Sequence, residues 1–237
     1  MTSTNIMIEA LSDQMNGHAR KVIIGLNWTL VEGPIGIGLA HTPVRGTSGC
    51  FGLSNAGKLS GKPLSDFVGG LTSENPFDRA LALAAINAHH NSFGLSGNNA
   101  NGLDLAAERQ NETVVIGRFP GLENRLPQAK VIEREPGPLD FPITSAPALL
   151  AKAETLLITA SAVTDGSLLN YLALAPDALT VLIGPGTPLS PALFEIGIDI
   201  LAGFVIDDKK RVITTVAQGG AVKALKSCGR NVCLLRP

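Results

Sequence analysis

The stretch LIGPGTPLSPALFEIGIDILAGFVI, residues 182–206, decides the fold class of this chain. Apolar runs rich in Val, Ile and Leu lie at its two ends, Thr180–Ile183 and Ile200–Ile206, and their lengths suit buried strands. A turn with two glycines leads from the first run into Pro191–Ile196, where proline takes the first position of an expected helix. A strand, a turn, a helix and a second strand in this order predict a βαβ unit with parallel strands.

The alternation of strands and helices extends upstream of this stretch. We expect further strands at Thr113–Gly117, Lys130–Glu133 and Thr155–Thr159, and helices at Ala146–Ala153 and Gly166–Leu174. Such a pattern is typical of a mostly parallel sheet with helices on both faces. Residues 108–237 therefore predict a Rossmann-like α/β domain.

The amino-terminal part has a different pattern. We expect a short helix at Met7–Asn16, a strand at Lys21–Val31, a hairpin partner at Gly36–Thr42 and a long Ala-rich helix that begins near Pro76. The polar run SGNNANG, residues 96–102, is typical of an exposed connection between domains. We therefore expect a small α+β domain over residues 1–107, followed by the Rossmann-like domain.

The composition excludes some classes of partner. The chain has 237 residues, 45% of them hydrophobic, and a formal net charge of −1, so it has no basic field to attract nucleic acid or anionic lipid. We expect neither nucleic acid nor a membrane as partner. Because no apolar stretch of about 20 residues and no secretory signal stand out, we expect a cytoplasmic protein. The sequence leaves open whether it forms a homo-oligomer.

The cysteines and histidines give little support for a metal site built by the protein alone. Cys50, Cys228 and Cys233 have no CxxC spacing, and the four histidines form no HxxxH or HExxH pattern. His89 and His90 are neighbours on the expected helix and point about 100° apart, so they would not readily share one ion. Cys50 is only a speculative nucleophile, since no adjacent base is visible.

Four segments together carry a resemblance to a known family. They are ALALAAINAHHN at residues 80–91, VVIGRFP at 114–120, VIEREPGPLDFP at 131–142 and the stretch at 182–206. In sequence and in order along the chain they resemble the family described as "putative heavy-metal chelation", in which a Rossmann-like domain follows a companion domain similar to the amino-terminal domain of enolase. The resemblance implies an enolase-N-terminal-like first domain here, and a divalent or heavy metal ion or a metal chelate as ligand. The sequence departs from the family at ASAVTDG, residues 160–166, where a Thr-rich or Asn-containing loop is common, so the chemistry of that loop is left open.

The turn that precedes Pro191 is the strongest candidate for a ligand site, because ligands of open parallel sheets bind beyond the carboxyl ends of the strands. Gly184 and Gly186 permit close approach of the backbone, and Ser190 is a natural N-cap for the expected helix. With Thr187, these residues predict a site for an anion or a carboxylate at a helix N-terminus. A tight turn whose prolines fix the geometry is the alternative.

Three charged candidates follow the first two strands of the second domain. Arg118 lies where a dinucleotide site needs GxGxxG, so NAD binding is disfavoured, and this arginine either pairs an anion or is an ordinary surface residue. Glu133 stands near the place where nucleotide-binding folds hold ribose hydroxyls, and a salt bridge with Arg134 or Arg125 is the alternative. Asp140 either contacts the ligand or stabilises its own turn.

The remaining candidates come from the loop after the third strand and from the first domain. The loop offers hydroxyl or carboxylate groups from Ser161, Thr164 and Asp165. We expect the facing wall to come from the first domain, with Trp28, Thr29, Asn87 and His90 as candidates. A buried Asn87 needs hydrogen-bond partners, so it either braces a loop or touches the ligand. Trp28 is either a core residue or a platform for the ligand.

Two classes of function fit these residues. In the first, the protein is related to heavy-metal chelation and binds a small anionic metabolite or a metal chelate between the two domains, with the turn at residues 184–191 and Arg118 as anion contacts. In the second, it is an enzyme that acts on a nucleoside-like or pterin-like compound, in which Glu133 binds hydroxyl groups of the substrate and Asp140 is the general base. A purely structural role is the third reading. The lack of an evident nucleophile–base pair favours binding over catalysis.

Overall fold

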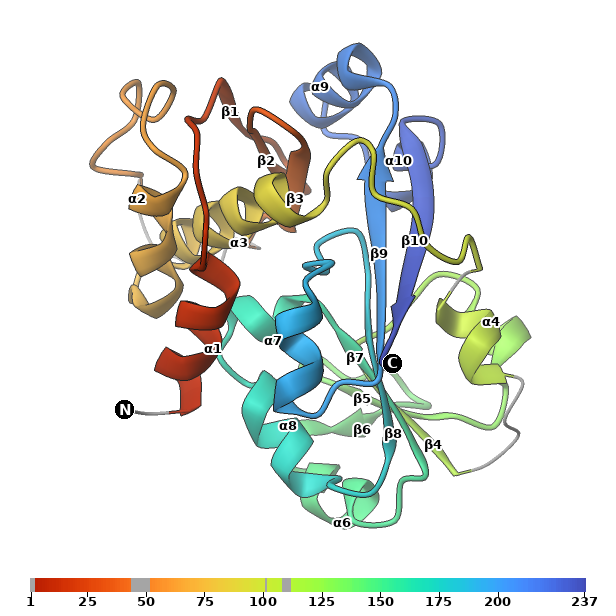
Figure 1. Cartoon of the computed structure of the whole chain (residues 1–237). Coiled ribbons are helices and arrows are strands. Elements are labelled where there is room, and N and C mark those ends of the chain that lie inside the picture. The colour runs from red at the N-terminus through yellow and green to blue at the C-terminus, as the bar shows by residue number, and fades with distance from the viewer. Residues whose placement is uncertain (1–2, 44–51, 101, 108–111) are drawn as a thin grey trace.

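The computed structural model describes residues 3–43, 52–100, 102–107 and 112–237, and in these ranges the chain forms two sheets with helices around them (Figure 1). The small sheet is antiparallel, in the order β1-β2-β3, with strands β1 (Lys21–Ile24), β2 (Trp28–Glu32) and β3 (Ile37–His41). The fold class is therefore confirmed as α/β, with a small antiparallel sheet and a large, mostly parallel one. No helix in the described ranges is long and apolar enough to cross a bilayer.

The large sheet has the strand order β10-β9-β8-β7-β4-β5-β6. Its strands are β4 (Thr113–Ile116), β5 (Lys130–Glu133), β6 (Phe141–Pro142), β7 (Thr155–Thr159), β8 (Leu179–Ile183), β9 (Ile200–Ile206) and β10 (Gly229–Leu235). Every pair of neighbours is parallel except β9 and β10. The chain starts in the middle at β4, runs outward through β5 and β6, and returns to the other side of β4 at β7. The order thus reverses between β4 and β7, which is where such sheets bind ligands.

Helices cover both faces of the large sheet. One face packs against α6 (Ala146–Leu150), α7 (Ser161–Thr164), α8 (Leu168–Leu174) and the 3-10 segment η3 (Pro191–Ile196), and the other against α4 (Gly102–Ala107) and α5 (Leu122–Arg125). The remaining elements are α1 (Ser3–Ser12), α2 (Ser65–Val68), α3 (Pro76–His90), α9 (Lys209–Ala217), α10 (Val222–Leu225) and the 3-10 turns η1 (Gly69–Thr72) and η2 (Ile143–Ser145).

Helix α3 begins where the sequence predicts. The side chain of Asn75 accepts a hydrogen bond from the N–H of Phe77, 3.0 Å away, and Pro76 takes the first helical position. The alanines of α3 let β3 approach closely: a Cβ added to Gly38 would lie 2.0 Å from the carbonyl oxygen of Ala84. The small sheet therefore rests directly on α3.

The small sheet is buried on both faces. One face of β2 and β3 contributes Val31 and Ala40 to the core that contains α3, and the other packs Leu30 and Leu39 against the end of β9 and against α9. Figure 1 shows α9, in blue, beside β1 and β2 although it lies far from them in sequence. This explains why all five residues of β2 are buried.

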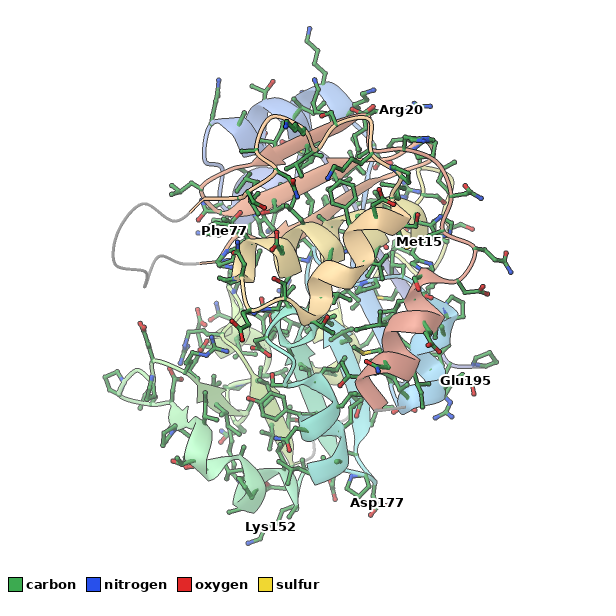
Figure 2. All side chains as sticks on the ribbon, turned by 90° about the vertical axis from the view of Figure 1, so that its left-hand side faces the viewer. Met15, Arg20, Phe77, Lys152, Asp177 and Glu195 are labelled. Carbon is green, nitrogen blue, oxygen red and sulfur yellow. The ribbon has the colours of Figure 1, made fainter. Side chains whose placement is uncertain are left out.

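The two sheets share a hydrophobic core. One continuous cluster joins residues of α1 and α3 to residues of β4, β7, β8 and η3. Figure 2 shows α1 alongside η3, whose Glu195 is labelled, and Met7 and Leu11 of α1 are buried in the same cluster as Leu193. The expected domains over residues 1–107 and 108–237 thus meet through a packed interface, and the residues next to that boundary, 108–111, lie outside the described ranges.

Several sequence expectations need correction. Lys21–Val31 is not one strand, because a turn closed by the N–H of Gly25 and the carbonyl of Trp28 separates β1 from β2. The first helix ends at Ser12, before the expected Asn16. Pro191–Ile196 is a 3-10 segment, and the antiparallel strand β10 and helix α9 were not predicted. Cys50 lies outside the described residues.

Candidate functional site

A cavity of about 320 Å³ lies at the reversal of strand order, between the carboxyl ends of the large sheet and the small sheet. The loops after β4, β7 and β8 form one side of it, and the ends of β2 and β3 form the other. The polar and aromatic side chains in its wall are those of Asn27, Trp28, His41, Arg118, Phe119, Thr159 and Ser161.

Arg118 lies in the cavity wall, and neighbouring residues hold it in position. Gly117 follows β4 with a φ of 92°, in the region that favours glycine, and the chain turns there. The Arg118 guanidinium donates to Asp140 Oδ1, and Asp140 Oδ2 accepts the N–H of Gly137 at 3.0 Å. The Asp140 side chain is only 4% exposed, whereas that of Arg118 is 46% exposed. Asp140 thus supports Arg118 from behind and does not line the cavity.

Glu133 fixes the same loop through its backbone. One carboxylate oxygen accepts the N–H of Arg118 at 2.6 Å, and the other accepts the N–H of Arg134 at 3.1 Å. The alternative of a salt bridge from Glu133 to Arg134 or Arg125 is wrong, because Arg134 pairs with Asp165 and Arg125 with Asp104. Glu133 therefore supports the loop, and it does not line the cavity.

The hydrogen bond from Arg118 and the contact with the Gly137 N–H hold the pKa of the Asp140 carboxyl below its usual range. A carboxylate with a lowered pKa is a poor proton acceptor near neutral pH. The geometry therefore argues against Asp140 as a general base.

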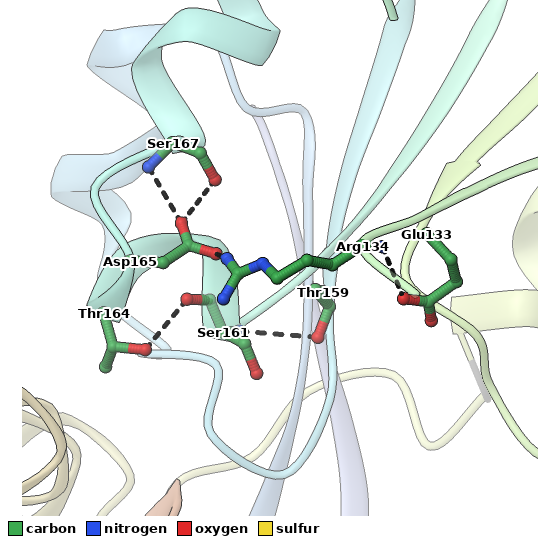
Figure 3. A network of polar contacts seen from close by, with 7 residues as sticks. All are labelled: Glu133, Arg134, Thr159, Ser161, Thr164, Asp165 and Ser167. Atoms are coloured by element: carbon green, nitrogen blue, oxygen red, sulfur yellow. Dashed lines mark hydrogen bonds and ion pairs between the residues drawn. The ribbon is translucent and has the colours of Figure 1, made fainter. Parts of the chain in front are cut away.

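The loop after β7 is organised by hydrogen bonds within it and by an ion pair with Arg134, which follows β5 (Figure 3). Arg134 reaches Asp165 at 2.8 Å, and Asp165 Oδ1 accepts the N–H of Ser167 at 2.9 Å. The Thr164 hydroxyl donates to the carbonyl of Ser161 at 2.8 Å. Of the residues predicted from this loop, Ser161 lines the cavity, whereas Thr164 and Asp165 stabilise the turn below it.

The glycine-rich turn after β8 differs from the expected helix N-terminus. Thr187 and Ser190 are 0% and 2% exposed and do not line the cavity. The Ser190 side chain makes no capping hydrogen bond, and the N–H of Thr187 donates to the carbonyl of Gly184. Thr187 and Ser190 therefore do not belong to the wall of this cavity, and their contact with an anion stays a prediction. The backbone of Gly184, Pro185 and Gly186 does line the cavity, so one part of the turn remains a candidate.

Two asparagines of the α3 region hold this turn in place. Asn87 Nδ2 donates to the carbonyls of Leu39 and Gly186, each at 2.8 Å, so it braces the turn against β3. Asn91 was missed by the sequence analysis. Its Nδ2 donates to the Thr187 carbonyl at 3.0 Å, and its Oδ1 accepts the N–H of Leu189 at 2.9 Å. The spacing of four residues, which puts both side chains on one helical face, was the available signal.

The small sheet supplies an aromatic wall. Trp28 is 7% exposed and meets the ring of His41 edge-on, with centroids 5.9 Å apart. His41 was also missed, although it pairs directly with Trp28 in the β2–β3 register. The two remaining candidates lie elsewhere: Thr29 bonds to the buried Thr42 hydroxyl at 3.1 Å, and His90 Nε2 donates to the carbonyl of Leu11 at 2.8 Å.

The electrostatics of the cavity combine a guanidinium that is ion-paired with Asp140 and an uncharged imidazole. Desolvation lowers the pKa of His41, which favours its uncharged form. Trp28 Nε1 is buried and has no hydrogen-bond partner among the described residues. The wall therefore offers a guanidinium, an imidazole ring nitrogen and two hydroxyls.

These groups do not fit a bare heavy-metal ion. Such ions are held in proteins by several thiolate, imidazole or carboxylate ligands, and the cavity wall offers one imidazole beside the positive charge of Arg118. Within residues 3–43, 52–100, 102–107 and 112–237, no three His, Cys, Asp or Glu side chains converge as a metal site would require. A ligand that carries its own negative charge fits the same wall better.

Comparison with known proteins gives the family. Two models described as "putative heavy-metal chelation" match residues 8–90 and 100–235. A crystal structure of a protein of unknown function from Desulfitobacterium hafniense, of the same family, superposes with a TM-score of 0.85 at 28% identity and covers 98% of this chain and 97% of its own. A relative of unknown function from Pyrococcus horikoshii has the same fold, with a TM-score of 0.77 at 22% identity and the same two coverages. No curated protein matches the sequence. Since the model for residues 100–235 alone spans more than half of the chain, the protein belongs to the family described as "putative heavy-metal chelation".

Proposed function

We propose that the protein binds a small organic anion, free or as the chelator of a metal ion, in the cavity between the small sheet and the carboxyl ends of β4, β7 and β8. The observation that carries this proposal is Arg118. Its N–H is held by Glu133 and its guanidinium by Asp140, at the edge of a cavity in the place where the strand order reverses.

The support for Arg118 favours recognition of a carboxylate or phosphate. A guanidinium has five N–H donors, so the bond to Asp140 leaves others for a ligand. Because the arginine is already held in position, binding loses less side-chain entropy than with a free surface arginine. Charge-assisted hydrogen bonds to such an anion contribute about 1.5–3 kcal/mol each.

The rest of the wall suits an organic body. Phe119 and the small exposed part of Trp28 offer apolar area, and the backbone of Gly184–Gly186 permits close approach. The cavity volume of about 320 Å³ lies at the lower end of the range for small-molecule sites. A metal would enter as part of the complex, and His41 would supply at most one protein ligand to it.

Catalysis is a second candidate, and His41 is the observation that favours it. Its neutral imidazole is the group in the wall best suited to accept a proton, a role that Asp140 does not fit. Native mass spectrometry separates the two functions. A binding protein releases its co-purified molecule with unchanged mass after incubation at 37 °C, whereas an enzyme returns a molecule of altered mass.

The test of binding uses the single tryptophan of the chain as reporter, because Trp28 lies in the cavity wall. Fluorescence is titrated with citrate, with the nickel–citrate complex and with Ni²⁺ alone. We expect citrate or its complex to change the emission saturably, and Arg118→Met to weaken this binding by at least about tenfold, or 1.4 kcal/mol.

The matched control is Arg20→Met, which removes an exposed arginine that lines neither cavity. It should leave the affinity for citrate unchanged. The proposal is wrong if Ni²⁺ alone binds as tightly as its citrate complex and Arg118→Met alters neither affinity, because the protein would then hold the metal directly.

A further inference from the structure

A second and larger cavity, of about 1140 Å³, adjoins the first. It lies over β9 and β10, between α4 and α5 on one side and α10 on the other. The two cavities share wall residues from the loop after β4, the turn after β8 and the start of α10, which are Phe119, Pro120, Gly184, Pro185 and Val222. A molecule longer than the small cavity can therefore pass over this shared wall into the larger one.

The larger cavity carries positive charge that is not neutralised within the protein. Two of its four basic side chains are engaged: Arg125 pairs with Asp104 at 2.7 Å, and Arg230 bonds to Asp207. Lys223 and Lys226, at and just after α10, form no ion pair with any residue in the described ranges.

Both of these lysines are exposed at the cavity wall, three residues apart. One acidic side chain of the wall, Glu123, also has no ion pair among the described residues, so the two lysines outnumber it. Flexible ammonium groups at the edge of an open cavity attract an anionic group without fixing its geometry. This differs from Arg118, which is held rigidly.

We infer that the two cavities form one site for an elongated dianion, with one anionic group at Arg118 and the second at Lys223 and Lys226. The middle of the ligand lies against Phe119, Pro120 and the Gly184–Pro185 backbone. The binding of one anionic group at Arg118 rests on the proposed function. The inference adds the ligand class, which is a molecule with anionic groups at both ends.

The experiment compares linear dicarboxylates, from succinate to sebacate, with the monocarboxylate of the same chain length. Trp28 fluorescence reports binding in the small cavity for every probe. We expect one range of chain lengths in which the dicarboxylate binds about tenfold more tightly than its monocarboxylate, the gain of one charge-assisted contact. The double variant Lys223→Ala/Lys226→Ala should remove that gain and leave monocarboxylate affinity unchanged.

The control is Lys152→Ala/Lys210→Ala, which changes the net charge equally at two exposed positions outside both cavities. It should keep the gain, and circular dichroism checks that all variants fold. The inference is overturned if no dicarboxylate binds more tightly than its monocarboxylate, or if this gain survives the loss of Lys223 and Lys226. In either case, monocarboxylate binding that depends on Arg118 would still support the proposed function. If Arg118→Met changes the affinity of neither probe class, both fail.

Discussion

At the scale of single residues, a few polar side chains set the shape of the cavity without entering it. Asn91 is 1% exposed and joins α3 to the turn after β8 through the carbonyl of Thr187 and the N–H of Leu189. Asp140, which does not line the cavity, holds the Arg118 side chain in the cavity wall by accepting its hydrogen bond. These contacts join residues about 20 to 100 positions apart, so each depends on the completed fold.

Replacing Asn91 with alanine leaves two buried backbone groups without partners. We expect Asn91→Ala to lower the free energy of unfolding by about 1–3 kcal/mol and to weaken citrate binding, because the turn that lines the cavity loses its anchor. Urea unfolding followed by circular dichroism measures the first effect. Asn55→Ala, at an exposed position, is the control and should change stability by less than about 0.5 kcal/mol.

Gly38 allows a sharper test of close packing. A Cβ at this position would collide with the backbone of Ala84 and Ala88 in α3, so Gly38→Ala should cost about 3 kcal/mol or more. Gly69 has a helical φ of −56° and open space around it, so Gly69→Ala should be neutral or stabilise by up to about 1 kcal/mol. Equal thermal stability of the two variants would contradict the packing of β3 on α3.

At the scale of elements, α3 links the amino-terminal helix to the cavity and carries two histidines at its end. Burial lowers the pKa of His89 and of His90, and the Nε2–H of His90 donates to the carbonyl of Leu11. A histidine whose folded-state pKa lies below its ordinary value of 6.5 binds its proton more readily in the unfolded chain. Stability is therefore complete above this pH and decreases as the pH falls below it.

We expect the urea midpoint of the protein to be lower at pH 5.5 than at pH 7.5. His90→Gln removes one of the responsible groups, so the decrease between these two pH values should be smaller in this variant, even if its stability at pH 7.5 is reduced. A decrease as large as in the wild-type protein would assign the pH dependence to other groups.

Elements with a strong local signal were predictable from the sequence, and elements defined by distant partners were not. The asparagine–proline start of α3 and the apolar runs of β7 and β9 are encoded locally. Strand β10 has polar Arg230 and Asn231 and is half-exposed at the sheet edge, so its pattern is weak. The same distinction holds at the cavity: Arg118 follows a recognisable strand, whereas His41 becomes a wall residue only because β2 and β3 bring it beside Trp28.

At the scale of the whole molecule, the two expected domains are held together by one core. In the connection, Ser96–Asn99 are exposed, whereas Ala100 is half-buried and Gly102 is buried, and Asn98 exchanges two backbone hydrogen bonds with Cys233 of β10. We expect limited proteolysis to cut first between Ser96 and Glu112. The two fragments should still elute together in size-exclusion chromatography and separate only in denaturant, because α1 and α3 share a hydrophobic cluster with β7 and η3. Separation in native buffer would show that this shared core contributes little.

The packing of α1 on η3 also sets an order of events while the protein is being made. Roughly 180 residues separate the two elements, so at about 5–20 residues per second the helix leaves the ribosome some 10–35 s before its partner exists. During that interval Met7 and Leu11, which are buried in the finished protein, lack the part of their packing that η3 supplies. A chain that stalls before Pro191 therefore exposes part of the apolar face of α1, and a chaperone that binds apolar segments can distinguish it from a completed molecule.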